Sequence, residues 1–147
     1  MSQNLLLDMV LSLDGTSGLL NQDQVYIHPH IPPKKLQNAI NSYANNVKPE
    51  NVMVLFDDTA FGGAKDGLIF TKDGLFTKQS FEKPNFIKLD NIRKISGGGL
   101  LKSVLNVNES KIISFDIISK GAVNGLCKLV ESYIEKLNDK NNLTENN

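Results

Sequence analysis

The sequence predicts an α+β fold: an antiparallel β-sandwich or partly open barrel with a C-terminal capping helix and two N-terminal helices. Two observations lead to this prediction. From about residue 50 to residue 118, short runs rich in β-branched and aromatic residues alternate with turn formers. On both sides of this block, apolar residues recur at helical spacing. A run of strands followed by a helix is typical of an α+β domain with an antiparallel sheet.

The N-terminal third predicts two helices. Apolar residues recur at helical spacing from Leu5 to Leu13, so we expect a short amphipathic helix over residues 4–13. The following "VYIHPHIPP" cannot be helical, because its prolines impose extended or turn geometry. Pro33 suits the first turn of a second helix ending near residue 46. The apolar face of that helix is expected to comprise Leu36, Ala39, Ile40 and Tyr43.

Five to seven strands are expected next. "NVMVLFDD" reads as a strand ending in turn formers, and "GLIFT" and "GLFTKQSF" as a hairpin with Asp73 and Gly74 at its turn. "NFIKLDNIRKI" alternates like a strand, and "SGGG" from Ser96 to Gly99 is expected to be a flexible turn. "LLKSVLNVN", with Leu100 and Leu101 as core residues, and "KIISFDII" then predict a second hairpin joined through "NES".

The C-terminal region predicts one helix and a tail. Its buried stripe is expected to comprise Val123, Leu126, Cys127, Val130, Ile134 and Leu137. The last residues are polar and rich in asparagine, which favours a disordered tail. The predicted organisation is a helical extension over residues 1–48, a β-rich domain with its helix over 49–138, and the tail over 139–147.

Composition limits the classes of partner. Sixteen basic and sixteen acidic residues cancel, which disfavours nucleic acid and anionic membranes as partners. The apolar N-terminal "NLLLDMVLSL" has no basic flank, and no run is long enough to span a bilayer. The single cysteine excludes an internal disulfide and a multi-cysteine zinc site. We expect a cytoplasmic protein without a cofactor.

Residues 50–138 resemble the bacterial pleckstrin-homology-like (PH/GRAM-like) domains. The likeness rests on "DGLIFTKDGLF" followed by "FIKLDNIRKI". The matching positions are Gly67, Thr71, Gly74, Phe76, Ile87, Leu89, Ile92 and Ile95. The resemblance implies a sandwich plugged at one end by a helix, and a habit of binding or self-assembly. It implies no catalytic residue.

The segment from Asp57 to Asp66 holds the candidate site residues. Asp57 and Asp58 are adjacent carboxylates that could hold Mg²⁺, but neighbouring strand residues point to opposite faces, and hydrogen bonds to nearby amides are the favoured interpretation. Gly62, Gly63 and Lys65 suggest a phosphate loop but lack its spacing and its helix, so a turn is favoured. In a partner-binding loop, Phe61 would be the aromatic anchor.

Other reactive residues favour structural roles. His28 and His30 have a ligand-like spacing, but zinc needs further ligands and none is nearby in the sequence. Cys127 lies on an apolar stripe, where a buried, inert thiol is expected. No metal site is therefore predicted. The strand after "SGGG" is expected in the core, with pairing to another chain as the alternative.

The favoured function is a non-enzymatic binding module that acts through a protein partner or by self-association into a homo-oligomer. An immunity or antitoxin-type protein is one form of this hypothesis. Two alternatives stay open. One is a metal-dependent hydrolase that uses Asp57 and Asp58 with a histidine. The other is a peripheral lipid-binding domain, although fold analogy alone is a poor warrant for function.

Overall fold

The computed structural model describes residues 2–145, which form three α-helices, three short 3-10 turns and eight strands. The N-terminal elements are α1 (Ser2–Leu11), η1 (Ser17–Leu19), β1 (Val25–Ile27), α2 (Pro33–Tyr43) and η2 (Pro49–Asn51). The elements that follow are β2 (Val54–Asp57), β3 (Gly67–Thr71), β4 (Gly74–Lys78), β5 (Asn85–Lys88), η3 (Leu89–Asn91), β6 (Ile95–Gly98), β7 (Ser103–Val107), β8 (Ser110–Phe115) and α3 (Lys120–Glu145).

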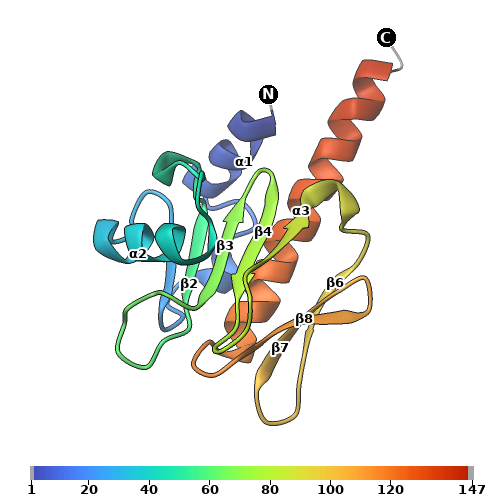
Figure 1. Cartoon of the computed structure of the whole chain (residues 1–147). Helices are drawn as coiled ribbons and strands as arrows, with labels where there is room; N and C mark the ends of the chain where they lie inside the picture. Colours follow the sequence, from blue (N-terminus) through green and yellow to red (C-terminus); the bar gives the residue numbers. More distant parts are fainter. Residues whose placement is uncertain (1, 146–147) are drawn as a thin grey trace.

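The strands form two antiparallel sheets, in agreement with the predicted α+β class. The first sheet has five strands in the order β1-β2-β3-β4-β5, and the second has three in the order β6-β7-β8. Within each sheet, every strand pairs with its neighbour in sequence, and all pairs are antiparallel. In Figure 1 the long helix α3 runs past both sheets. The two sheets are separate, so the described residues form no closed barrel.

The first sheet is covered on both faces. One face packs against α1, α3 and the second sheet, with Phe56, Phe70, Phe115 and Tyr133 at the centre of this core. The opposite face packs against α2, whose buried residues are Leu36, Ala39, Ile40 and Tyr43, as predicted. Every residue of β2 and β3 is therefore buried, which explains why these strands are continuous hydrophobic runs rather than alternating ones.

The N-terminal segment belongs to the same hydrophobic core as the rest of the chain. Its strand β1 pairs with β2, and the helix α2 lies on the first sheet (Figure 1). Leu6, Met9 and Val10 of α1 share the main core with α3. The elements α1, β1 and α2 are thus packed on the two sheets.

Several local predictions were wrong. Gly97 and Gly98 lie in β6, although "SGGG" is predicted as a turn. Leu100 and Leu101 lie outside the core, in the segment between β6 and β7. The glycine run forms a strand, and glycine at position 97 lets α3 pack closely against it. A β-carbon on Gly97 would lie 2.7 Å from Asn124 Oδ1.

Two boundaries also differ. The β3–β4 turn comprises Lys72 and Asp73, because Thr71 pairs with Gly74. Glycine is needed at position 74 because its φ is +146° and a β-carbon there would collide with the Ile87 carbonyl of β5. At the C-terminus, α3 continues to Glu145, so the described part of the predicted tail is helical; residues 146–147 lie outside the described residues.

Candidate functional site

Four chain segments meet at one end of the two sheets. Asp58, just after β2, accepts hydrogen bonds from the backbone N–H groups of Asp116, Ile117 and Ile118, just after β8. Asp66, just before β3, accepts from Lys78 Nζ and Ser80 Oγ at the end of β4. The pairing of Ser103 with Phe115 brings the β6–β7 connection to the same end. We call residues 58–66, 79–84, 99–102 and 116–119 the loop end; these segments lie at the bottom of Figure 1.

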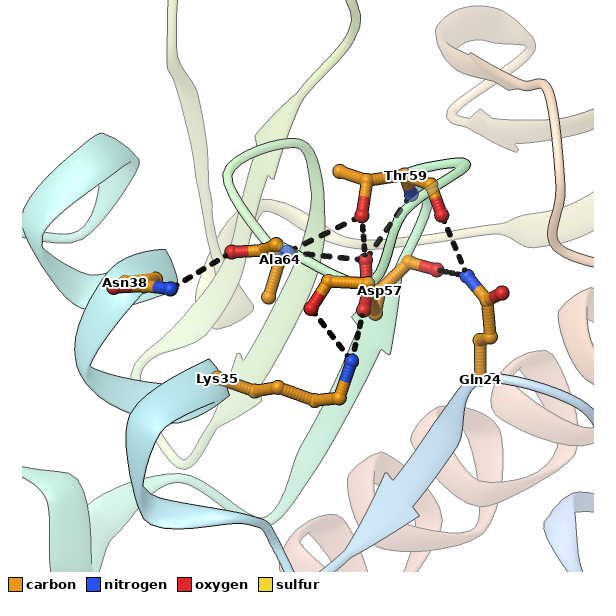
Figure 2. A network of polar contacts seen from close by, with 8 residues as sticks. Gln24, Lys35, Asn38, Asp57, Thr59 and Ala64 are labelled. Atoms are coloured by element: carbon orange, nitrogen blue, oxygen red, sulfur yellow. Dashed lines mark hydrogen bonds and ion pairs between the residues drawn. The ribbon is translucent and has the colours of Figure 1, made fainter.

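The carboxylate of Asp57 is enclosed by donors (Figure 2). Lys35 Nζ lies 2.7 Å from Asp57 Oδ2, while the backbone N–H groups of Thr59 and Ala64 and the Thr59 hydroxyl donate to Oδ1. The hydrogen bond to Asp57 raises the pKa of Lys35, with burial of the ammonium opposing the shift. All of these donors are protein groups, so the arrangement organises the segment that follows β2.

Helix α2 supplies a second set of bonds to the same segment. Lys35 Nζ also donates to the Gly62 carbonyl, Asn38 Nδ2 donates to the Gly63 carbonyl, and Ser42 Oγ donates to the Lys65 carbonyl. The three donors occupy positions i, i+3 and i+7 of α2, which lie on one face of a helix. The segment is thereby fixed along its length. Figure 2 shows Lys35 and Asn38 reaching from α2 towards it.

Asp58 points away from Asp57, as the alternation of a strand predicts. Its carboxylate receives three backbone N–H bonds of 2.7 to 3.0 Å. Burial raises the pKa of Asp58, and these three bonds oppose that shift. The side chain therefore connects the end of the first sheet to the segment that leads into α3. The favoured interpretation, hydrogen bonding to nearby backbone amides, agrees with the geometry of Asp57 but not with that of Asp58, whose donors lie 58 to 60 residues further along the chain.

The predicted site residues thus divide into two groups. Asp57 and Asp58 are buried and hydrogen-bonded inside the protein, and they present no free carboxylate to a partner. Phe61 and Lys65 are exposed on the surface of the same segment. Gly62, with φ of +77°, lies between them close to Lys35, where a β-carbon would come within 2.8 Å of Nζ. Gly63 has open space around it.

The glycine-containing segment offers no free backbone N–H to a phosphate group at Ala64. The Ala64 N–H, which a bound anion would need, already donates to Asp57 Oδ1. The next regular element is the strand β3 rather than a helix. The favoured interpretation as a turn agrees with both facts.

Large apolar side chains project into solvent from the loop end. The four most exposed ones in the described residues are Phe61 at 101%, Phe81 at 104%, Leu100 at 96% and Leu101 at 99%. They come from three different connections of the two sheets, and Ile117, in the segment between β8 and α3, is also exposed. A single exposed leucine is common on protein surfaces, but four fully exposed large apolar side chains on the loops of one end single that end out as the candidate contact surface.

Sequence reasoning identified only Phe61 among these residues. The sequence predicts Phe81 in a strand, and Leu100 and Leu101 in the core. A signal was available for Phe81, since "QSFEKP" places the aromatic residue among polar residues and next to a proline. No signal in one sequence could show that the three connections meet, because that depends on the pairing of distant strands.

The remaining histidine, cysteine and acidic side chains of the described residues form no metal-binding cluster. Among residues 2–145, no three His, Cys, Asp or Glu side chains are close enough together to hold a metal ion. Cys127 is buried, and burial together with the nearby Glu131 raises its pKa to about 11. No helix in the described part of the chain is sufficiently long and apolar to cross a membrane.

Comparisons with protein-family models, with curated proteins and with solved structures found no match to this chain.

Proposed function

We propose that this chain is a non-enzymatic interaction module of the pleckstrin-homology-like type, which binds a protein partner through its loop end. The carrying observation is that Phe61, Phe81, Leu100 and Leu101, each at least 96% exposed, project from three connections at the same end of the two sheets. Aromatic and aliphatic anchors of this kind supply most of the binding energy when a partner provides pockets for them.

The order of elements supports the pleckstrin-homology-like part of this proposal. Strands β2 to β5, then β6 to β8, then α3 follow the order of two sheets and a closing helix that the resemblance implies. Strand β1 and helix α2 would be additions specific to this chain. By attaching to β2 and to residues 62–65, they hold the Phe61 segment in place.

The geometry of the two aspartates weighs against the hydrolase alternative. A hydrolytic metal site needs carboxylates that converge on one cation. Here Asp57 faces Lys35 and Asp58 faces the amides before α3, and both have their oxygens engaged. Recruiting them to a metal would require breaking bonds that hold the fold together.

A matched pair of variants tests the proposed contact surface. The loop variant carries Phe61→Ser, Phe81→Ser, Leu100→Ser and Leu101→Ser. The control variant carries Leu11→Ser and Leu143→Ser, two other exposed leucines. Each protein is used to capture partners from a lysate of the native organism, and its oligomeric state is measured by sedimentation.

We expect wild type and control to retain one protein at a stoichiometric ratio, and the loop variant to lose it. Loss of a homo-oligomer in the loop variant alone would identify self-association through the same surface. An immunity or antitoxin-type role requires the captured protein to be a toxin inhibited by this chain. The proposal fails if the loop variant retains the same partner and the same oligomeric state as wild type.

One observation favours a lipid surface as a second candidate. Lys65, Lys83 and Lys120 are exposed at or next to the loop end and form no ion pair in the described residues. Exposed lysines beside apolar tips suit an anionic interface. Co-sedimentation with phosphatidylcholine vesicles, with and without phosphatidylserine, tests this at low and high salt. We also propose that the interaction module acts in the cytoplasm.

A further inference from the structure

A hollow lies at the end of the molecule opposite the loop end. The pairing of Gly67 with Lys78 places one end of the β3–β4 hairpin at the loop end, so the turn of Lys72 and Asp73 lies at the other. Helix α3 begins beside the loop end and runs past the sheets to the same far end (Figure 1). The hollow there has a volume of about 860 Å³. Small-molecule sites typically have volumes of roughly 300–1,000 Å³.

We call this hollow the far pocket. Its lining comes from the β3–β4 turn, from β4 and β5, from η3 and from the last part of α3. The lining residues that matter for its chemistry are Lys72, Phe76, Phe86, Lys88, Leu137 and Lys140.

One wall of the far pocket carries an exposed aromatic ring. Phe86 of β5 is 46% exposed and belongs to neither hydrophobic core. Its ring lies beside that of Phe76 in β4, with the ring centroids 4.5 Å apart and the planes inclined by 30°. Leu137 of α3 adds a half-buried aliphatic side chain. A flat apolar group in the pocket would therefore have an aromatic partner to stack on.

The charged side chains of the far pocket favour an anion. Three lysines (Lys72, Lys88 and Lys140) and two aspartates (Asp73 and Asp90) line it. Lys72 lies 3.7 Å from Asp73, and Lys88 lies 3.8 Å from Asp90. In both pairs the aspartate is the more exposed partner, at 68% against 35% and at 80% against 63%. The carboxylates thus project into solvent, whereas the lysine stems lie closer to the protein surface.

We propose that the far pocket binds a small aromatic carboxylic acid. The ring of the ligand stacks on Phe86 and contacts Leu137, and its carboxylate faces the ammonium groups of the three lysines. Such a molecule matches both parts of the lining, an apolar wall and a rim with more ammonium than carboxylate groups. The site lies at the opposite end from the loop end, so this inference does not rest on the proposed function.

The test titrates 2-naphthoate into the ¹⁵N-labelled full chain. We expect chemical-shift changes centred on the turn at Lys72 and Asp73, on Lys88 and Leu89, and on residues 137–141. Two control compounds separate the features of the ligand. Acetate has the carboxylate without the ring, and 2-naphthylmethylammonium has the ring with the opposite charge. Each is expected to bind about tenfold more weakly than 2-naphthoate.

A matched pair of variants tests the charge of the rim. The pocket variant carries Lys72→Gln, Lys88→Gln and Lys140→Gln. It is expected to bind 2-naphthoate about tenfold more weakly than wild type, because exposed charge pairs contribute modestly and add up. The control variant carries the same change at three exposed lysines outside the pocket and is expected to keep the wild-type affinity; its changes are Lys34→Gln, Lys111→Gln and Lys128→Gln.

A second pair of variants tests the aromatic wall. Phe86→Ser is expected to weaken 2-naphthoate about tenfold, since the stacking partner is lost. Phe81→Ser, at the loop end, is expected to leave the affinity unchanged, which distinguishes this site from the proposed partner surface. If Phe86→Ser does not fold, Phe86→Leu removes the ring and keeps an apolar side chain.

The proposal is overturned if millimolar 2-naphthoate causes no shift at the far pocket, or if the shifts centre on another part of the chain. It is equally overturned if 2-naphthylmethylammonium or acetate binds as tightly as 2-naphthoate. Wild-type affinity in the pocket variant would refute the role of the lysines, and wild-type affinity after loss of the Phe86 ring would refute the stacking.

Discussion

The backbone of Gly125, within α3, lies directly against the backbone of Gly18 in η1. A β-carbon on Gly125 would come within 2.6 Å of the carbonyl carbon and oxygen of Gly18. This contact fixes the N-terminal segment to the long helix. It also explains a glycine inside a helix, where glycine is otherwise unfavourable.

The substitution Gly125→Ala is expected to destabilise the protein by about 2 kcal/mol, because the new methyl group has no room against rigid backbone. At an ordinary exposed helix position the same change would stabilise by about 1 kcal/mol. Urea unfolding measures the difference. Gly121→Ala is the control: its β-carbon would meet only the end of the flexible Gln22 side chain, at 3.1 Å. A stable Gly125→Ala protein would contradict the close contact.

Replacing Asp58 by alanine is expected to reduce the free energy of unfolding by about 3 kcal/mol, since three backbone N–H groups lose a charged acceptor. Hydrogen exchange should accelerate at Asp116, Ile117 and Ile118. Asp90→Ala, at an exposed position with only a surface ion pair, serves as the control and should change stability by less than about 0.5 kcal/mol. Equal exchange rates in the two variants would refute the connecting role of Asp58.

The substitution Lys35→Met is expected to loosen the segment that presents Phe61. It leaves the buried Asp57 carboxylate without its cation and the Gly62 carbonyl without its donor. We expect the free energy of unfolding to fall by about 2 kcal/mol. This is less than is usual for breaking a buried ion pair, because the Lys35 side chain is 23% exposed. Faster hydrogen exchange at residues 59–64 is the diagnostic measurement. Lys65→Met, which removes an exposed lysine without an ion pair, should change neither quantity.

Because the Cys127 thiol is buried, we expect the protein to lose stability at alkaline pH. Burial raises the pKa of the thiol in the folded protein to about 11, against 9.0 for an unperturbed thiol, so the folded state holds the proton more tightly than the unfolded state. The resulting stability is complete below pH 9 and is lost as the pH rises through about 11. Between pH 8 and about pH 10.5, wild type should lose roughly 2 kcal/mol more than Cys127→Ala. Parallel losses in the two proteins would exclude this cause.

The loop-end variant with four serines is expected to keep the melting temperature of wild type within about 2 °C, since its side chains make almost no contact in the isolated chain. Thermal unfolding followed by circular dichroism checks this. Phe56→Ala, in the core, should instead destabilise by about 4 kcal/mol. A large loss in the serine variant would mean that these residues are structural, and would remove the support for a contact surface.

The sequence alone determined the elements whose pattern is local. The helical period from Leu36 to Tyr43 and from Val123 to Val130 identified the buried faces of α2 and α3, because a single helix carries its whole signal within its own residues. The runs of β2, β3 and β4 were equally clear. So was the divergence of Asp57 and Asp58, which follows from the alternation of any strand.

The tertiary structure decided whatever depends on distant pairing. Phe61, Phe81 and the two leucines at 100 and 101 form one end only because the connections of two sheets meet there. The sequence predicts a turn at the glycines of β6 because the residue that approaches Gly97, Asn124 of α3, lies far along the chain. Conformational freedom of glycine is a local property, whereas the space it leaves for a neighbour is determined by the packing of the whole molecule.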